Sequence, residues 1–85
     1  MSNFYIVTFN NTHEAMQGED ICQKEKVKIT MMPTPTYITK SCGISLKVEE
    51  NHFNSLERVI NDKKLEYKSI YHFNGNTAQE VKIGQ

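Results

Sequence analysis

Residues 4–9 read FYIVTF, a run of six residues that is rich in β-branched and aromatic side chains. Such a run predicts a strand that is apolar on both faces and therefore central in its sheet. Asn11 then provides a helix cap, and Glu14, three residues later, completes a variant of the capping box. The following residues are good helix formers up to about Glu25, so the sequence predicts a helix directly after this strand.

The predicted helix carries one face made mainly of small residues. Ala15, Gly18, Glu19 and Cys22 recur at the spacing of a single helical face. A face of small side chains predicts a helix that lies close to its sheet. On this face Cys22 is interpreted as a core residue. It lies about 15 Å along the helix axis from Thr12, which argues against a disulfide between Cys22 and Cys42.

The rest of the chain supplies three more strands and a second helix. Alternating apolar residues predict strands over residues 27–32 and 44–49. Helical spacing predicts a second helix from Phe53 to Lys63 behind an Asn51 cap, and residues 66–73 are typical of a final strand.

This order of elements predicts the fold. Strand, helix, strand, strand, helix, strand within one short chain is the ferredoxin-like βαββαβ plan. We therefore expect an α+β fold in which an antiparallel four-stranded sheet carries both helices on one face. Residues 1–73 would form this single domain, and residues 74–85 a loose polar tail. This plan places three segments at one edge of the domain: the end of the first strand, the start of the first helix and the loop at 33–43.

Composition restricts the classes of function. The 85-residue chain is long enough for one domain, and its ten Lys and Arg balance ten Asp and Glu. A neutral chain whose predicted strand over residues 44–48 lacks an aromatic residue is not expected to bind nucleic acid, so RNA recognition ranks third. The N-terminus has no basic run, and its apolar stretch is too short for a signal peptide or membrane span. We expect a cytoplasmic protein that does not bind membranes.

The loop from Pro33 to Gly43 is the candidate functional segment. Eleven residues are many for a hairpin loop in so small a domain. The predicted site comprises Cys42 as the reactive residue, Lys40, Ser41, Gly43, Thr12 and His13 as supporting residues, and Pro33, Thr34 and Pro35 as the loop scaffold. An ammonium at Lys40 and the amino end of the first helix at Thr12 and His13 would favour the thiolate, which is the nucleophilic form. Gly43 would allow a partner to approach closely.

The residues alone leave alternatives open. Cys42 is equally explained as a small buried residue that begins a strand. His13 is either a base near Cys42 or a solvated residue, and His72 is interpreted as an exposed strand residue. His13, His52 and His72 lack the spacing of a metal site, so neither a metal nor another cofactor is expected.

Several of these residues together carry a family resemblance. The pattern consists of residues 5–9, Thr12, Ala15, Met32-Pro33-Thr34-Pro35, Ile38, Ser41-Cys42-Gly43-Ile44 and Leu46. Over roughly residues 4–71 the chain resembles a small bacterial family described as selenium/sulphur carrier-like. The resemblance implies a cytosolic protein that holds sulphur or selenium on one cysteine, and Cys42 occupies the matching position.

Two functions follow as hypotheses. The first is a carrier, rather than a turnover enzyme, that holds the chalcogen on Cys42 as a persulphide or selenosulphide between donor and acceptor proteins. The second is a non-catalytic module that binds a protein or a small ligand. Because helices can cover only one face of the sheet, some of Phe4, Tyr5, Ile6 and Val7 should lie on an open face and support a homodimer or the binding of a larger partner.

Overall fold

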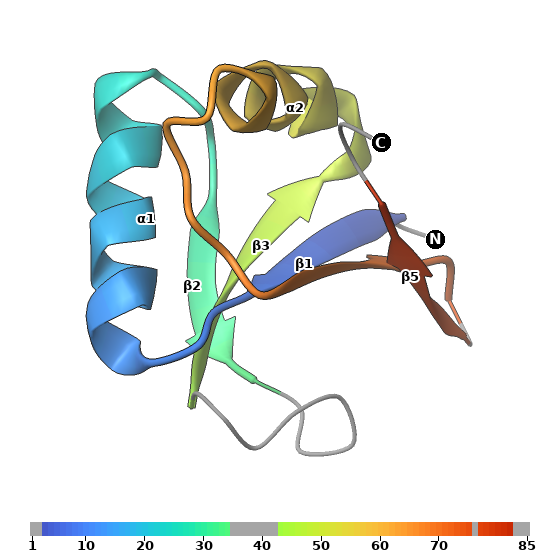
Figure 1. The fold of residues 1–85 in the computed structure, drawn as a ribbon. Helices are drawn as coiled ribbons and strands as arrows, with labels where there is room; N and C mark the ends of the chain where they lie inside the picture. The colour runs from blue at the N-terminus through green and yellow to red at the C-terminus, as the bar shows by residue number, and fades with distance from the viewer. Residues whose placement is uncertain (1–2, 35–42, 76, 83–85) are drawn as a thin grey trace.

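The computed structural model describes residues 3–34, 43–75 and 77–82. It shows an α+β fold with two helices beside an antiparallel sheet (Figure 1). The elements are β1 (Phe4–Thr8), α1 (Thr12–Lys24), β2 (Thr30–Pro33), β3 (Ile44–Glu49), the 3-10 turn η1 (Glu50–His52), α2 (Phe53–Asn61), β4 (Ser69–Phe73) and β5 (Ala78–Val81).

The sheet has the strand order β2-β3-β1-β4-β5, and every neighbouring pair is antiparallel. The apolar strand β1 is central, as its sequence predicts. The predicted count of four strands is wrong, because β5 pairs with β4 in a register that places Val81 opposite Ile70. This edge strand is held by backbone hydrogen bonds and is mostly exposed, so it lacks the apolar pattern by which strands are recognised. The ferredoxin-like assignment stays a prediction.

Helix α1 begins and ends through local hydrogen bonds. The Asn11 side chain accepts a hydrogen bond from the Glu14 amide at 2.8 Å, which confirms the predicted cap. The Glu14 carboxylate accepts from the Asn10 amide at 2.9 Å, one residue earlier than in a regular capping box. At the other end Lys26 adopts a φ of 62°, and the Val27 amide donates to the Cys22 carbonyl at 2.8 Å. These features form a Schellman motif.

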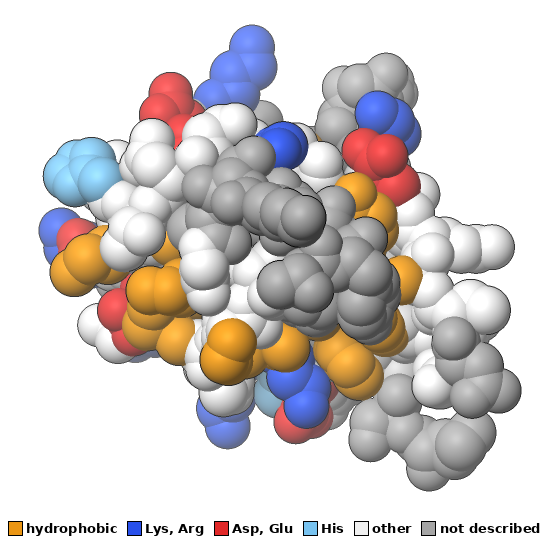
Figure 2. Space-filling view, turned by 90° about the horizontal axis from the view of Figure 1, so that it is seen from below, with side chains coloured by type: hydrophobic (Ala, Val, Ile, Leu, Met, Phe, Trp, Pro, Cys, Tyr) orange, Lys and Arg blue, Asp and Glu red, His pale blue; other side chains and the backbone are white. Residues whose placement is uncertain are grey.

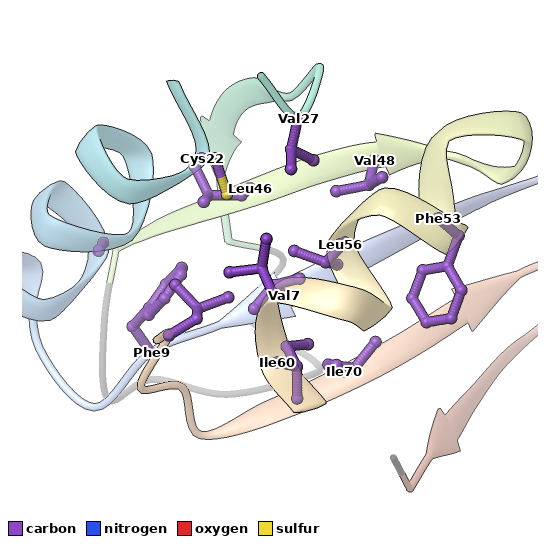
Figure 3. Packing of buried hydrophobic residues seen from close by; sticks show 13 residues of the cluster. Val7, Phe9, Cys22, Val27, Leu46, Val48, Phe53, Leu56, Ile60 and Ile70 are labelled. Carbon is purple, nitrogen blue, oxygen red and sulfur yellow. The ribbon is translucent and has the colours of Figure 1, made fainter. Parts of the chain in front are cut away.

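One hydrophobic core joins both helices to the sheet (Figure 3). The core includes three fully buried residues from the neighbouring strands β1, β3 and β4, namely Val7, Leu46 and Ile70. The predicted small-residue face of α1 is confirmed, because Ala15, Gly18 and Cys22 are its buried residues. From α2 the core receives Phe53, Leu56, Val59 and Ile60.

Some predicted boundaries are wrong for identifiable reasons. Asn51 does not cap α2, because it lies inside η1 and the helix begins at Phe53 without a side-chain cap. The second helix ends at Asn61 rather than Lys63, since Lys63 takes a left-handed φ of 61°. The strand expected from Val27 begins at Thr30, because Val27 still belongs to the Schellman motif of α1.

None of the helices in the described parts of the chain has the length and hydrophobicity needed to cross a bilayer.

Candidate functional site

The candidate loop is bounded by β2 and β3, which pair so that Pro33 lies opposite Ile44. Pro33, Thr34 and Gly43 lie within the described residues, as do Thr12 and His13. Pro35, Lys40, Ser41 and Cys42 lie outside them. The site can therefore be built from the two ends of the loop and from the start of α1.

Hydrogen bonds between backbone groups and between side chains join the two ends of the loop. The Thr34 amide donates to the Gly43 carbonyl at 3.0 Å. The Thr34 and Ser45 hydroxyls are hydrogen bonded to each other, with Thr34 8% and Ser45 0% exposed. Because one bond is between backbone groups and the other between buried side chains, the end of β2 and the start of β3 are tied at two points.

Pro33 occupies a strand position that does not require an amide. In an antiparallel pair, residues with inward-facing backbone groups alternate with residues whose groups face away. Since the Thr34 amide faces β3, the backbone nitrogen of Pro33 faces the outer edge of the sheet. Proline is tolerated at such an edge position, so it can end β2 without losing a hydrogen bond of the ladder.

Gly43 is exposed and has room around it. A Cβ atom at this position would meet no atom within 4 Å among the described residues. Crowding by the described residues therefore does not explain why glycine stands there.

Helix α1 starts at the same end of the sheet as this loop base (Figure 1). Thr12 and His13 are both exposed in its first turn. The Glu14 carboxylate also lies at this helix end, where it accepts from the Asn10 amide at 2.9 Å and from the Asn10 side chain at 3.0 Å. Its negative charge offsets part of the attraction that the amino end of α1 would exert on a thiolate.

Cys22 lies in the core, as predicted. It is fully buried on α1, and this burial raises the pKa of its thiol to about 11. At neutral pH Cys22 therefore stays protonated, in the form that neither attacks nor transfers sulphur.

The three histidines lie in separate elements. The expectation that His72 is exposed is wrong, because 23% of its side chain is accessible and its ring lies 4.6 Å from that of Tyr5. Its Nε2 atom lies 3.5 Å from Oε2 of Glu50 in η1. Within residues 3–34, 43–75 and 77–82, no three His, Cys, Asp or Glu side chains form a group that could hold a metal ion.

The sheet face opposite the helical core, called here the helix-free face, carries Ile6, Thr8, Ser45 and Lys47, which alternate along β1 and β3 with core residues such as Val7 and Leu46. The sequence did not predict the buried hydroxyl groups on this face. Ser45 and Thr8 are both fully buried there, although their alternation with core residues predicts exposure. The Thr8 hydroxyl donates to the Ser69 carbonyl across the sheet at 3.2 Å. One sequence feature distinguishes Ser45 from the other residues of β3 that point away from the core. Ser45 is small, whereas Lys47 and Glu49, farther from the loop, have long side chains.

The helix-free face is less open than the sequence suggests. Ile6 lies on this face in register with Lys47 and Tyr71, yet it is only 1% exposed. Phe4 stacks on Phe73 with ring centroids 5.2 Å apart, and the Lys47 ammonium lies 4.6 Å above the Phe4 ring. An open patch centred on Ile6 is therefore absent, and a homodimer through this face stays a prediction.

The view from the loop end of the sheet shows hydrophobic, acidic and basic side chains together (Figure 2). On this face, acidic and basic side chains of the described residues lie near one another.

A separate groove of about 350 Å³ lies along α1, with lining residues that include Gln17, Ile21, Lys64 and Glu66. Gly18 also contributes to its wall.

Comparisons with known proteins place the chain. No curated protein and no solved structure matches it. Residues 4–72 match the family described as "Putative Se/S carrier protein-like", a span that runs from the start of β1 into β4 and includes the whole candidate loop. The chain therefore belongs to this Se/S carrier-like family.

Proposed function

We propose that this protein carries sulphur or selenium on Cys42 between a donor and an acceptor protein. The observation that carries the proposal is the burial of Cys22 in a member of this family. The chain has two cysteines, and the pKa of Cys22 is raised to about 11 by its place in the core. A carrier that works through a thiolate must therefore use Cys42.

The transfer conserves atoms and electrons without an added oxidant. The Cys42 thiolate attacks the terminal sulphur of a persulphide on the donor, and a new sulphur–sulphur bond forms at Cys42. The bond to the donor's own sulphur breaks, and the donor leaves as a thiolate. In the second step a nucleophile of the acceptor takes the terminal sulphur, and Cys42 leaves as a thiolate. A selenium atom would follow the same route through a selenosulphide.

The surroundings of the loop support this chemistry. Lys40 lies two residues before Cys42 in the sequence, and its ammonium would stabilise the thiolate and the persulphide anion. Among the described residues, no atom lies within 4 Å of a Cβ placed on Gly43, which suits the approach of a partner's nucleophile. Ser41, Thr12 and His13 would complete the surroundings, with Glu14 opposing the positive field of the helix end. A reducing cytoplasm would keep Cys42 free of disulfides.

Sulphur loading tests the proposal directly. The purified protein is incubated with a cysteine desulphurase and cysteine, and its intact mass is measured under non-reducing conditions. We expect the mass of one added sulphur atom on the wild type and on Cys22→Ala, and none on Cys42→Ser. Reduction should remove the added atom. Equal addition to Cys42→Ser, or none to the wild type, would refute the carrier.

A further inference from the structure

The connection between β4 and β5 contains the one Asn-Gly pair of the sequence, Asn74-Gly75. Both residues are exposed. The Asn74 amide donates to the Thr77 carbonyl at 3.2 Å, and the Thr77 hydroxyl donates to Oδ1 of Asn74 at 2.9 Å. The second bond directs the side-chain carbonyl of Asn74 toward the far end of the connection. Solvent therefore reaches an asparagine whose side chain lies beside the backbone that follows it.

The glycine leaves the backbone nitrogen after Asn74 unshielded. Gly75 has no Cβ atom to cover its own nitrogen, and its φ of 108° is a conformation that glycine adopts without strain. Asparagine is one of the thermolabile residues of proteins. Its instability arises because Cγ and the next backbone nitrogen can close a small ring, and a side chain on the following residue hinders that closure. The pair therefore has the chemistry and the exposure that ring closure requires.

We propose that Asn74 is a site of spontaneous deamidation and that its isoaspartate product loosens β5. The Gly75 nitrogen loses its proton to hydroxide and forms a bond to Cγ of Asn74. The bond from Cγ to the side-chain nitrogen breaks, and that nitrogen leaves as ammonia with a proton from water. Water then opens the cyclic imide at either carbonyl and yields aspartate or isoaspartate. One water is consumed and one ammonia released, without oxidation or reduction.

The two products differ in the backbone of the connection. Aspartate keeps the original backbone, and its carboxylate can still accept the bond from Thr77. Isoaspartate carries the main chain through the former side chain, which adds a methylene between residue 74 and Gly75. This methylene disturbs the register that places Phe73 opposite Ala78. Because the first three residues of β5 are exposed, little packing opposes its release from β4.

Release of β5 changes one border of the sheet. The strand order ends β1-β4-β5, so β4 becomes the border strand and its backbone groups are open to pairing with another chain. The site lies outside residues 4–72, the span that matches the Se/S carrier-like family. The inference therefore does not depend on the proposed carrier function.

Ageing of the purified protein at mildly alkaline pH tests the first step, because the reaction begins with the loss of a backbone amide proton. Modified residues are located by peptide mass and fragmentation, and aspartate and isoaspartate are separated by chromatography. We expect residue 74 to react several-fold faster than Asn51 and Asn61, which are also exposed but precede residues with side chains. Gly75→Ala should slow the reaction.

Asn74→Gln is the second variant, since it keeps a side-chain amide but would have to close a larger ring. It should show no reaction at residue 74. A synthetic peptide of residues 69–82 gives the rate without the fold. An intact Asn74 in the folded protein while this peptide deamidates, or a rate no faster than that of Asn51, overturns the proposal.

Hydrogen exchange tests the second step. The isoaspartate form is purified from aged protein, and amide exchange in β5 is compared with that of fresh wild type and fresh Asn74→Asp. This variant carries the same new charge on an unaltered backbone, so it isolates the effect of the methylene. We expect several-fold faster exchange of β5 in the isoaspartate form alone, with β1 and β3 unchanged. Equal exchange in all three proteins, or equally fast exchange in Asn74→Asp, overturns the proposed loosening.

Discussion

A Cβ atom on Gly18 would lie 2.8 Å from Cζ of Phe9. Real Cβ atoms do not approach other heavy atoms so closely, so α1 contacts the chain after β1 at a distance that only glycine permits. Phe9 is fully buried, and a second contact at 3.2 Å to Cδ1 of Leu65 closes the other side. The small-residue face of α1 is thus a requirement of packing.

Gly18→Ala should therefore destabilise the protein. Alanine is the better helix former by about 1 kcal/mol, but overpacking a filled core costs about 1–3 kcal/mol. We expect a net loss of about 1 kcal/mol in the free energy of unfolding, measured by urea titration. Gln17→Ala, at the exposed neighbouring position, is the control and should be neutral or slightly stabilising. A Gly18→Ala variant more stable than the wild type would contradict the close packing.

The burial of Cys22 predicts a loss of stability in alkaline solution. Its pKa in the folded state is raised to about 11, above its value of 9.0 in the absence of burial. The unfolded chain therefore releases this proton first, and stability falls as pH rises from about 9 to 11. The loss from this group should be up to about 2 kcal/mol. Because Lys and Tyr also titrate in this range, the measurement is the difference between wild type and Cys22→Ala, and parallel profiles would refute it.

The two thiols should differ in the native protein. We expect a thiol reagent to modify Cys42 rapidly and Cys22 only on unfolding, because a buried thiol is protected. The reaction at Cys42 should slow as pH falls through the pKa of its thiol. Lys40→Glu should shift this midpoint upward, since a carboxylate disfavours a nearby thiolate.

Lys24→Glu is the control for Lys40→Glu, because it makes the same change of charge in the last turn of α1, away from the loop. It should leave the midpoint in place. Equal reaction of both cysteines in the folded protein, or protection of Cys42, would remove the physical basis of the carrier.

Two residues after the end of each helix lies a lysine in a left-handed conformation. Lys26 and Lys63 have φ values of 62° and 61°, and each donates its amide to a carbonyl three residues earlier. Glycine adopts this conformation without the steric cost that other residues bear. Lys26→Gly and Lys63→Gly should each stabilise the protein by about 0.5–1 kcal/mol in urea titrations. Lys24→Gly, inside α1, should destabilise it by a similar amount. A change in the free energy of unfolding with the same sign in all three variants would contradict the cost of the left-handed lysines.

The sequence predicted the elements whose signals are local. The apolar run at residues 4–9 gave the central strand, and Asn11 with Glu14 gave the start of α1. The polar strand β5 was missed because an edge strand can be held by backbone bonds alone. The hydroxyl pair was missed because Ser45 bonds to Thr34, which follows a different strand, β2.

Only part of the candidate site was predicted, because its other contacts join residues from different strands. Spacing and composition marked the loop that ends at Gly43, and the burial of Cys22 agrees with its predicted role in packing. The contacts that close the loop base arise only when β2 and β3 pair. The register in which β2 pairs with β3 cannot be deduced from a single sequence.

The outward nitrogen of Pro33 has a consequence for self-association. An incoming strand at β2 would find no amide donor at this position, and at the opposite border it would meet the exposed Gln79 and Glu80 of β5. Both borders therefore discourage the growth of a continuous sheet from one molecule to the next. For the carrier proposed above, such borders would favour encounters with successive partners over stacking of one copy on the next.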